Sequence, residues 1–417
     1  MTLFSRWILL VIGLMLSSCA TERIPEDIQR TFPEAFSIIV KNDLDAARED
    51  VAVFLDVKAL KRKVGVFNPR ACVVLCDGVE LPSQLVEDLD MKIVVSADFS
   101  PEEKKRVTLC YRQAGEETRD YPKRTQAELS VKVGGRFVNR VYRGGAFQNV
   151  SFLRVPPEHT DHSFYVRYEG PGWESDKVGY RFYLDWRNAI DIYGKKTPDM
   201  VLQNVGQDGF ESYHEMSDWG MDVLKVGDAL GIGSLGMWVD GKAERVSVTD
   251  SVTCRIAADG PVVSKIQTSY YGWLVGDGAF DVVSDLVICA GSRITWHGVE
   301  VTGDPENLCT GLVKHENTTV LQSDSDTGWS YLALWGEQSL AGDDLGIVVF
   351  YRFEDLVEVT EDELNYAVVL RPEDGRVTYG FAAAWEQEPD GIRTKEAFVD
   401  YLENTIESLN SPLNVRY

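Results

Sequence analysis

Short runs of β-branched and aromatic residues recur between residues 36 and 385, and they restrict the folds open to this chain more than any other feature. VAVFLDV, KIVVSADF and GIVVFYRF are typical, and Gly, Asp, Asn or Pro separates one run from the next. Many short strands at close spacing predict antiparallel β-sandwiches. We therefore expect an all-β fold.

The clearest helix pattern lies at the C-terminal end of the chain. Apolar residues recur there at three- and four-residue spacing, which would place them on one face of a helix that packs against a sheet. They are Phe398, Tyr401, Leu402, Ile406 and Leu409.

The order of the strand runs suggests two folded units. A charged, turn-rich stretch at 114–126 separates a short first group of strands from a much longer second group. We predict a small immunoglobulin-like sandwich over 34–120 and a large antiparallel sandwich over 121–417. Residues 198–236 are richer in Gly, Asp and Met than in strand formers, so we expect long loops there, across the mouth of the large sandwich.

The first 19 residues have the pattern of a bacterial lipoprotein signal peptide. Arg6 gives a positive start, residues 7–16 are apolar, and Leu16-Ser17-Ser18 runs into Cys19. The apolar stretch is shorter than the roughly 20 residues of a membrane-spanning helix. We expect export, a lipid on Cys19, a polar tether over 20–33 and a place at the periplasmic face of the outer membrane.

Charge and cysteine content limit the partners and the redox chemistry. A net charge of −24 argues against nucleic acid, because no broad basic surface can neutralise phosphates. Six cysteines remain besides Cys19, an even number in an oxidising compartment, so both disulfides and reduced core thiols are open. No second close pair or CxxC accompanies Cys72 and Cys76, so the cysteine spacing does not favour a zinc site.

Basic residues gather locally in one part of this acidic chain. Residues 131–200 hold eleven Lys and Arg against eight Asp and Glu. An anionic ligand could bind here. Tryptophans in and after this stretch, Trp173, Trp186 and Trp219, offer flat apolar faces to sugar rings, although core packing is the better reading for Trp186, which alternates within a strand.

Strand parity separates the side chains of VGYRFYLDWR, residues 178–187. As one strand, it would place Tyr180 with Phe182 on one face and Arg181 with Asp185 and Arg187 on the other. A buried face of this polarity needs a purpose, whereas on an exposed sheet it would be a solvated face with cross-strand pairs. Pairing with HSFYVRYEG, residues 162–170, could bring Arg167 near Arg181.

Among the five histidines, His214 is the strongest catalytic candidate. It lies in a polar loop beside Tyr213 and Glu215, and an imidazole can accept a proton near neutral pH. Asp161-His162 follows Glu158-His159 with ligand-like spacing, so a divalent metal stays possible, although no metal site is assigned.

Several chemistries lack their motifs. The chain has no GxSxG elbow, HExxH, P-loop or dinucleotide fingerprint after a strand. A carboxylate pair for glycoside hydrolysis stays open, because Glu174, Asp185, Glu215 and Asp222 all lie in the rich segment and only their spatial separation decides.

Long segments resemble a family of exported bacterial proteins known as domain of unknown function family 4861. The resemblance rests on GPGWESDKVGYRFYLDWRNAIDIYGKK, on DWGMDVLKVGDALGIGSLG, and on IIVKNDLDAAREDVAVFLDV with DGVELPSQL. Members occur beside polysaccharide lyases, and some are similar to an oligosaccharide dehydratase of ulvan breakdown. The resemblance implies a mutarotase-like or lyase-like sandwich and a 4,5-unsaturated uronyl product. It assigns no catalytic residue.

These observations lead to a uronide dehydratase or lyase-like enzyme as the first hypothesis. Arg167 or Arg181 would hold the substrate carboxylate, His214 would be the base, and Tyr213 or Tyr180 the acid. Further substrate contacts are predicted at Trp173, Glu174, Lys177, Asp185, Arg187, Trp219 and His315.

Two rivals from other classes remain. A lipid-anchored glycan-binding protein would stack Trp173 and Trp219 on sugars without turnover. A glycoside hydrolase or epimerase would act on the same anionic oligosaccharides. The mass of the product separates all three, since only dehydration removes one water from an intact oligosaccharide.

Overall fold

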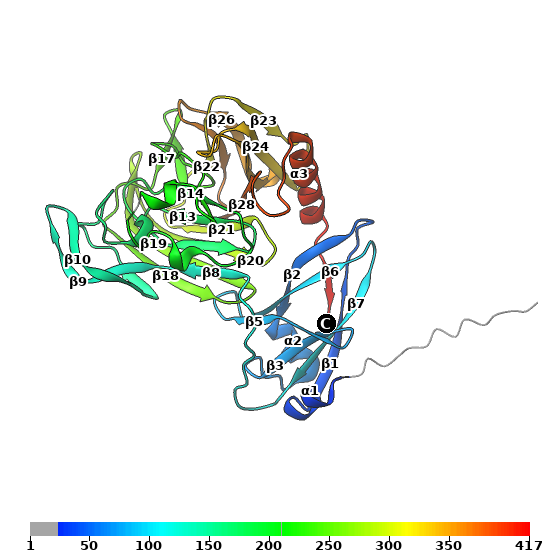
Figure 1. The fold of residues 1–417 in the computed structure, drawn as a ribbon. Helices are drawn as coiled ribbons and strands as arrows, with labels where there is room; N and C mark the ends of the chain where they lie inside the picture. The colour runs from blue at the N-terminus through cyan, green and yellow to red at the C-terminus, as the bar shows by residue number, and fades with distance from the viewer. Residues whose placement is uncertain (1–23, 210) are drawn as a thin grey trace, which may run out of the picture.

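Antiparallel sheets make up most of the computed structural model, which describes residues 24–209 and 211–417 (Figure 1). The expected all-β sandwich class is confirmed. The predicted signal peptide and Cys19 lie outside the described residues. No helix within the described ranges is long and apolar enough to cross a membrane.

Two small sheets form the N-terminal unit. One has the strand order β29-β1-β7-β3-β4 and the other β2-β6-β5, with side chains such as Ile38, Leu55 and Leu109 buried between them. Their bounds are β1 Glu34–Lys41, β2 Arg48–Asp56, β3 Cys72–Cys76, β4 Val79–Leu81, β5 Ser83–Val86, β6 Lys92–Phe99, β7 Lys104–Tyr111 and β29 Asn414–Arg416.

Two short helices belong to the same unit and were not expected from the sequence. Helix α1 is Glu26–Thr31, and α2 is Val57–Val64. The Asp56 side chain accepts a hydrogen bond from the backbone N–H of Ala59, which caps α2 directly after strand β2. A cap at the last strand residue lets the chain change from strand to helix without a loop.

The domain limits stay a prediction except at the C-terminal end. The large unit was expected to hold all of 121–417, but β29 pairs with β1 in the N-terminal sheet, with Lys41 opposite Asn414. The chain therefore crosses between the two units twice.

A nine-stranded sheet forms one layer of the large unit. Its order is β11-β18-β19-β20-β21-β28-β25-β24-β23. The bounds are β11 Phe152–Arg154, β18 Ser251–Asp259, β19 Val263–Val275, β20 Gly278–Cys289, β21 Ile294–Val301, β23 Thr318–Gln322, β24 Trp329–Glu337, β25 Asp344–Arg352 and β28 Arg376–Trp385.

Two five-stranded sheets form the facing layer, in the orders β15-β14-β13-β12-β8 and β17-β16-β22-β27-β26. Their bounds are β8 Thr125–Glu128, β12 Gly172–Ser175, β13 Gly179–Phe182, β14 Ile190–Lys195, β15 Gly220–Asp222, β16 Gly236–Val239, β17 Lys242–Arg245, β22 Leu308–Val313, β26 Leu356–Glu361 and β27 Asn365–Leu370.

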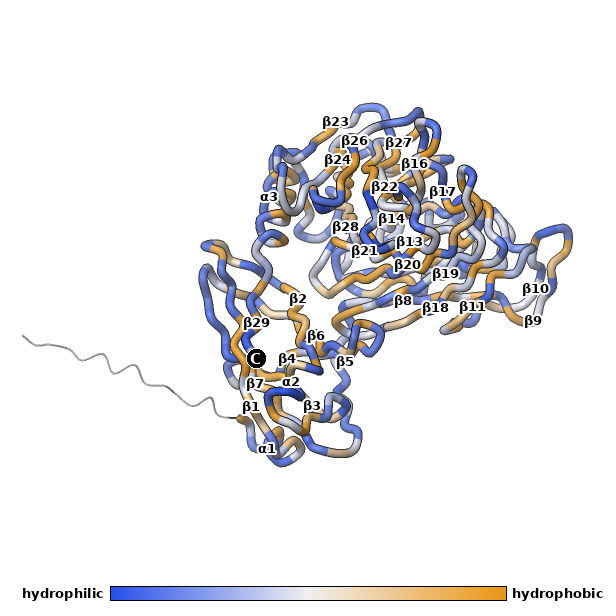
Figure 2. Tube along the Cα trace, turned by 180° about the vertical axis from the view of Figure 1, so that it is seen from behind, coloured by the Kyte–Doolittle hydropathy of each residue, from blue (hydrophilic) through white to orange (hydrophobic). Residues whose placement is uncertain are grey.

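The main core lies between these layers. Tyr180 of β13 packs edge-on against Phe381 of β28, and the Tyr379 hydroxyl donates to the carbonyl of Gly233. Figure 2 shows hydrophobic residues concentrated along the strands and hydrophilic residues along the connecting loops. Burial of one face per sheet explains the alternating pattern of the strand runs.

Helix α3, Lys395–Asn410, covers the outer face of the nine-stranded sheet as predicted (Figure 1). Phe398, Leu402 and Ile406 are buried against β24, β25 and β28. The Thr394 side chain caps the helix by accepting from the N–H of Ala397. The three- and four-residue spacing therefore identified the buried face.

The six cysteines outside the signal region are free thiols, and five of them are buried. Of the two alternatives that the sequence left open, the structure has the reduced one. Burial raises the pKa of the Cys254 thiol to about 12, so this group is inert as a nucleophile.

A two-stranded hairpin, β9 Ser130–Val138 and β10 Val141–Asn149, projects from the large unit (Figure 1). After it, HSFYVRYEG was predicted to be a strand, but the chain there bends and forms the short 3-10 helix η1, Arg167–Glu169. His162, Phe164, Tyr168 and Glu169 have positive φ, a conformation outside the range of a regular strand. The loops expected over 198–236 are present, with the 3-10 turns η2 Leu202–Asn204 and η3 Ser212–His214, but the short strand β15 at Gly220–Asp222 interrupts them.

Candidate functional site

The sheet of β8, β12, β13, β14 and β15 carries the candidate site on the face that points away from the main core. Arg181 of β13 lies directly opposite Asp191 of β14, and the next pair along is Tyr180 with Ile192. Because side chains alternate across a strand, Tyr180 and Ile192 enter the core, and Arg181 and Asp191 point to the other side. Loops cover that side, so its polar residues are buried as well.

Arg181 is the centre of this buried polar group. It is 1% exposed. Its guanidinium donates to Asp191 at 3.0 Å, to Asp222 at 2.6 Å and to the Tyr183 hydroxyl at 3.1 Å. A further bond of 2.8 Å reaches the Tyr213 hydroxyl. Two carboxylates thus share one cation.

The surroundings of Asp191 change its tendency to hold a proton. Burial and the neighbouring charge of Asp222 raise the pKa of Asp191 to about 7, although Arg181 opposes both effects. Repulsion between two carboxylates at one site has this effect in general. Asp191 therefore retains a proton more readily than an ordinary carboxyl group.

His214 closes the group on its solvent side. Its Nε2 lies 3.3 Å from Asp222 Oδ2, and its side chain is 40% exposed. The hydrogen bond to Asp222 raises the pKa of His214 above 6.5, although burial opposes it. Its ring lies 4.7 Å from that of Tyr213, between ring centres. Burial raises the pKa of Tyr213 well above 10, so its hydroxyl stays protonated at neutral pH.

A hollow of about 320 Å³ opens next to Tyr213, which lines it, whereas His214 touches it only through Tyr213. Trp219 stands on its wall, half-buried and edge-on to Tyr193 at 5.8 Å. The lining residues come from the loops that cover the sheet: Asn204, Val205, Gly206, Gln207, Asp208, Ser212, Tyr213, Ser217 and Trp219. Of the predicted residues, the structure thus brings together Tyr213, His214, Arg181 and Trp219.

Arg167 lies beside this group but is fully engaged. It is 2% exposed and forms a buried ion pair with Glu128, which also accepts the Tyr168 hydroxyl at 2.8 Å. The expectation that Arg167 or Arg181 holds a substrate carboxylate is therefore wrong, because both are enclosed and paired with carboxylates of the protein. Both arginines hold neighbouring side chains of the site in place from its buried side.

Three other predicted residues belong to the interior. Trp173 is 1% exposed, stacks on Tyr180 and donates to Thr295. Tyr180 is fully buried, donates to the Arg293 carbonyl and cannot be a catalytic acid. Glu174, also fully buried, pairs with Lys195 and is no substrate contact. Each of these predictions fails because strands β12 and β13 are both covered on their two faces.

A second polar cluster contains Arg187 and Asp185. Arg187 bonds Asp185 through two nitrogens, and its guanidinium also reaches Asp161 at 2.8 Å and Glu169 at 3.0 Å. These contacts engage both predicted substrate-binding residues within the protein. The charges of Arg181 and Arg187 lower the pKa of Glu169 to about 2 despite its burial, and Glu169 lies between the two arginines.

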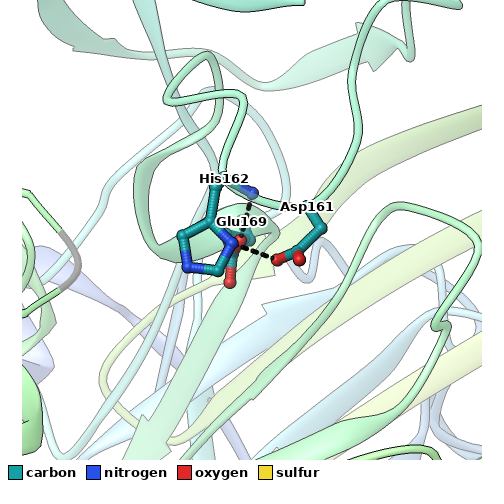
Figure 3. A group of neighbouring side chains, drawn as sticks. All are labelled: Asp161, His162 and Glu169. Atoms are coloured by element: carbon teal, nitrogen blue, oxygen red, sulfur yellow. Dashed lines mark hydrogen bonds and ion pairs between the residues drawn. The ribbon is translucent and has the colours of Figure 1, made fainter.

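Asp161, His162 and Glu169 form the group of described residues whose ligand atoms could hold a metal, all within 4.8 Å of one another (Figure 3). His162 Nδ1 already contacts Asp161 Oδ1 at 2.6 Å. The Arg187 guanidinium bonds the carboxylates of both Asp161 and Glu169. A protein cation therefore already neutralises two of the three potential ligands.

Comparison with known proteins places the chain in a family. The model of the family described as domain of unknown function, DUF4861, matches residues 40–415. The chain belongs to the DUF4861 family. No curated protein matches it.

Two solved structures from Enterococcus faecalis resemble this DUF4861 chain. A protein in glycosyl hydrolase family 38 has a TM-score of 0.47 at 12% identity, over 95% of this chain and 48% of its own. An alpha-mannosidase has a TM-score of 0.44 at 11% identity, over 92% of this chain and 46% of its own. The DUF4861 chain thus spans about half the length of each.

The remaining predicted residues of the DUF4861 chain lie apart from the hollow. Lys177 is half-buried, and its positive charge favours the ionised forms of Asp50 and Glu388. His315 is half-buried near Lys225, and no contact within the described ranges joins it to Arg181. Trp186, predicted to pack, is 45% exposed because the chain leaves the sheet after Phe182.

Sequence reasoning missed several partners in the DUF4861 site. Asp191 stands between Ile190 and Ile192 in IDIYGK, a signal that could have marked a buried polar position. Glu128 gave no signal, since it follows a run of ordinary strand residues and meets Arg167 only through tertiary folding.

Proposed function

We propose that this protein is a carbohydrate-processing enzyme that removes water from the non-reducing-end uronic acid of anionic oligosaccharides such as ulvan fragments. The product would be a 4,5-unsaturated uronyl group. One observation carries the proposal: Tyr213, held by Arg181, lines a hollow together with the half-buried Trp219, and His214, held by Asp222, lies in ring contact with Tyr213.

The two side chains differ in the way that an elimination needs. Neutral His214 removes the proton at C5, and the electron pair of that C–H bond forms the C4–C5 double bond. The C4–O bond breaks at the same time, and Tyr213 donates its proton to the departing oxygen, so that water leaves. Each group would contribute roughly 10²–10⁴ in rate.

Asp222 and Arg181 support these roles without contacting substrate. The Asp222 carboxylate stabilises the imidazolium that forms on His214. Arg181 donates to the Tyr213 oxygen, so it stabilises the phenolate left after proton transfer. Both are 1% exposed, which keeps their charges in a medium of low polarity.

Substrate contacts would come from the wall of the hollow. Trp219 offers an apolar face to a sugar ring. Lys196 is exposed, and its backbone N–H donates to the Trp219 carbonyl at 2.7 Å. Its side chain is a candidate to neutralise the substrate carboxylate, the task that the sequence had assigned to Arg167 or Arg181.

Mass spectrometry tests the proposal directly. The wild-type protein is incubated with uronic oligosaccharides from ulvan, pectin and alginate, and loss of one water with new near-ultraviolet absorbance is the expected result. His214→Ala and Tyr213→Phe should abolish this product, whereas Met216→Ala, an exposed side chain of the same loop, should not. Normal turnover by His214→Ala would remove His214 from the mechanism.

The rival functions give other outcomes. Tight binding without any change of mass would favour a glycan-binding protein that uses Trp219. Cleavage into shorter sugars would favour a glycoside hydrolase. Asp191 and Asp222 are the carboxylates that such an enzyme would need, but both bond Arg181 and, unlike Tyr213, neither lines the hollow.

The proposal extends to location. A lipid on Cys19 would hold the enzyme at the periplasmic face of the outer membrane, where short oligosaccharides arrive after import.

A further inference from the structure

The projecting hairpin of β9 and β10 is cationic in a strongly acidic chain. Between Glu128 and Glu158 the sequence has five Lys and Arg and no Asp or Glu, against a net charge of −24 for the whole chain. Three of the five, Arg136, Arg140 and Arg143, lie on the outer part of the hairpin.

We propose that residues 130–149, here called the cationic arm, bind the anionic chain of an oligosaccharide whose end occupies the hollow beside Trp219. The ligand class is a glycan that carries a carboxylate or sulfate on successive sugars. This inference rests on the proposed function for what happens at the hollow, but not for the binding itself.

Two arginines of the arm face each other without a counterion. Arg136 and Arg143 are direct cross-strand partners, so their side chains share one face of the hairpin. Both are exposed, and neither forms an ion pair with any described residue. Like charges in this position destabilise a hairpin, and an anion between them would remove the repulsion.

The third arginine occupies the tight turn. Asn139 and Arg140 have φ of 49° and 68°, the left-handed conformation of a two-residue hairpin loop. Glycine is the favoured residue at the second position of such a loop, because a side chain costs energy there. An exposed arginine at this position adds its charge to the same end of the arm.

Aromatic packing fixes which face of the arm meets solvent. Phe137 and Tyr142, also cross-strand partners, pack on Tyr165 with ring centres 5.1–5.3 Å apart. The backbone N–H of Tyr142 donates to the Ser163 carbonyl at 2.7 Å. Because side chains alternate, Arg136 and Arg143 are on the opposite, outer face.

The arm adjoins the candidate site through the segment 163–168. Lys132 donates its backbone N–H to the Tyr165 carbonyl, and Val131 pairs with Val166. Tyr168, two residues after Val166, donates its hydroxyl to Glu128. Its ring lies near Gly206, which lines the hollow. A chain that leaves the hollow on this side would meet the base of the arm.

The position of the arm favours a glycan over a membrane as its partner. The arm projects from the side of the large unit and lies far from helix α1, the first described element, in both views (Figures 1 and 2). If the N-terminal side is held at the membrane, the arm lies on a distant part of the molecule. Anionic lipid is therefore an outcome of the test and not the proposal.

Calorimetric titration in the His214→Ala protein tests the arm without turnover. The variant Arg136→Gln/Arg140→Gln/Arg143→Gln should bind a uronic octasaccharide about tenfold more weakly, the effect of losing three exposed ion pairs. Its affinity for the disaccharide should not change. The matched control, Lys58→Gln/Lys61→Gln/Arg62→Gln on α2, removes three exposed charges elsewhere and should bind both ligands normally.

Two further measurements complete the test. Replacement of the three arginines by lysine should restore octasaccharide binding, and added salt should weaken that binding in the parent more than in the glutamine variant. Equal octasaccharide affinity of the parent and the glutamine variant would overturn the inference. Loss of binding to phosphatidylglycerol vesicles with glycan binding retained would overturn it in favour of lipid.

The proposed function can fail separately. If the wild-type protein never removes water from an oligosaccharide but the glutamine variant loses octasaccharide binding, the dehydratase proposal is wrong and the arm is still a glycan-binding site. If water is removed and the variant binds both ligands as the parent does, only the arm proposal is wrong.

Discussion

Removal of one partner from the buried Glu174–Lys195 ion pair should destabilise the large unit strongly. Both side chains have no exposed surface, and Lys195 Nζ lies 2.6 Å from Glu174 Oε2. The other Glu174 oxygen accepts the backbone N–H groups of Val201 at 2.8 Å and Leu202 at 2.9 Å. The pair thus ties the start of the loop that lines the hollow to strand β12.

Glu174→Gln keeps the shape and the acceptor for both N–H groups but leaves a buried ammonium. The Ser175 carbonyl, 2.7 Å away, would be its one remaining partner among the described contacts. We expect a loss of about 3–5 kcal/mol in the free energy of unfolding, as for other buried pairs that lose one member. The double variant Glu174→Gln/Lys195→Met removes both charges and should lose only about 1–2 kcal/mol.

Urea denaturation followed by tryptophan fluorescence gives these free energies. The matched control is Glu300→Gln, which breaks an ion pair with Arg376 of 2.8 Å on the exposed side of the sheet. That pair should contribute at most about 1 kcal/mol. The reasoning from burial is wrong if Glu174→Gln lowers the free energy of unfolding no more than Glu300→Gln does. It is also wrong if the double variant is less stable than Glu174→Gln alone.

Other predictions concern pH, packing and anchoring. Product formation should rise as pH passes upward through the folded pKa of His214, which lies above 6.5, because only the neutral ring is a base. Asp222→Asn should lower the pH at the midpoint of this rise. A rate that does not change between roughly pH 5 and pH 9 would contradict the role of His214 as the base. The raised pKa also means that His214 stabilises the fold below about pH 6.5 and that this stabilisation is lost as pH rises through the folded pKa. Phe398→Ala should cost about 3–5 kcal/mol, measured by urea denaturation, because Phe398 is fully buried between α3 and the sheet; a loss below about 1 kcal/mol would show that α3 contributes little packing. Cys19→Ser should move the protein from the membrane fraction to the soluble fraction on an immunoblot, and an unchanged distribution would exclude a lipid at this residue.

Alternation along the chain predicted much of the fold but not what covers each face. It correctly placed Tyr180 and Arg181 on opposite sides of a strand, and the helical spacing gave the buried face of α3. The same pattern could not tell that loops enclose the Arg181 side, since the enclosing residues follow tens of positions later. Trp173 and Trp186 consequently exchanged their expected roles of surface and core.

Local sequence also concealed the places where backbone conformation overrides strand preference. HSFYVRYEG has strand-forming residues, yet Tyr168 and Glu169 have φ of 38° and 71°. Tertiary contacts impose this, because Glu128 bonds both Arg167 and Tyr168. The hairpin after AELSVKV was missed for another reason: Gly135 approaches the opposite strand so closely that a Cβ there would lie 2.4 Å from the Arg143 carbonyl oxygen, and glycines weaken a strand pattern.

The pairing of β29 with β1 has a consequence for biosynthesis. β1 is among the first segments to leave the ribosome, but its neighbour on one side is the segment around Asn414. Until that segment arrives, β1 is an open edge with unpaired N–H and C=O groups, a template for association between nascent chains. Closure of the sheet requires contact between distant parts of the sequence, which slows folding. A chaperone that shields this edge during export would therefore matter more for this protein than for one whose first unit completes itself.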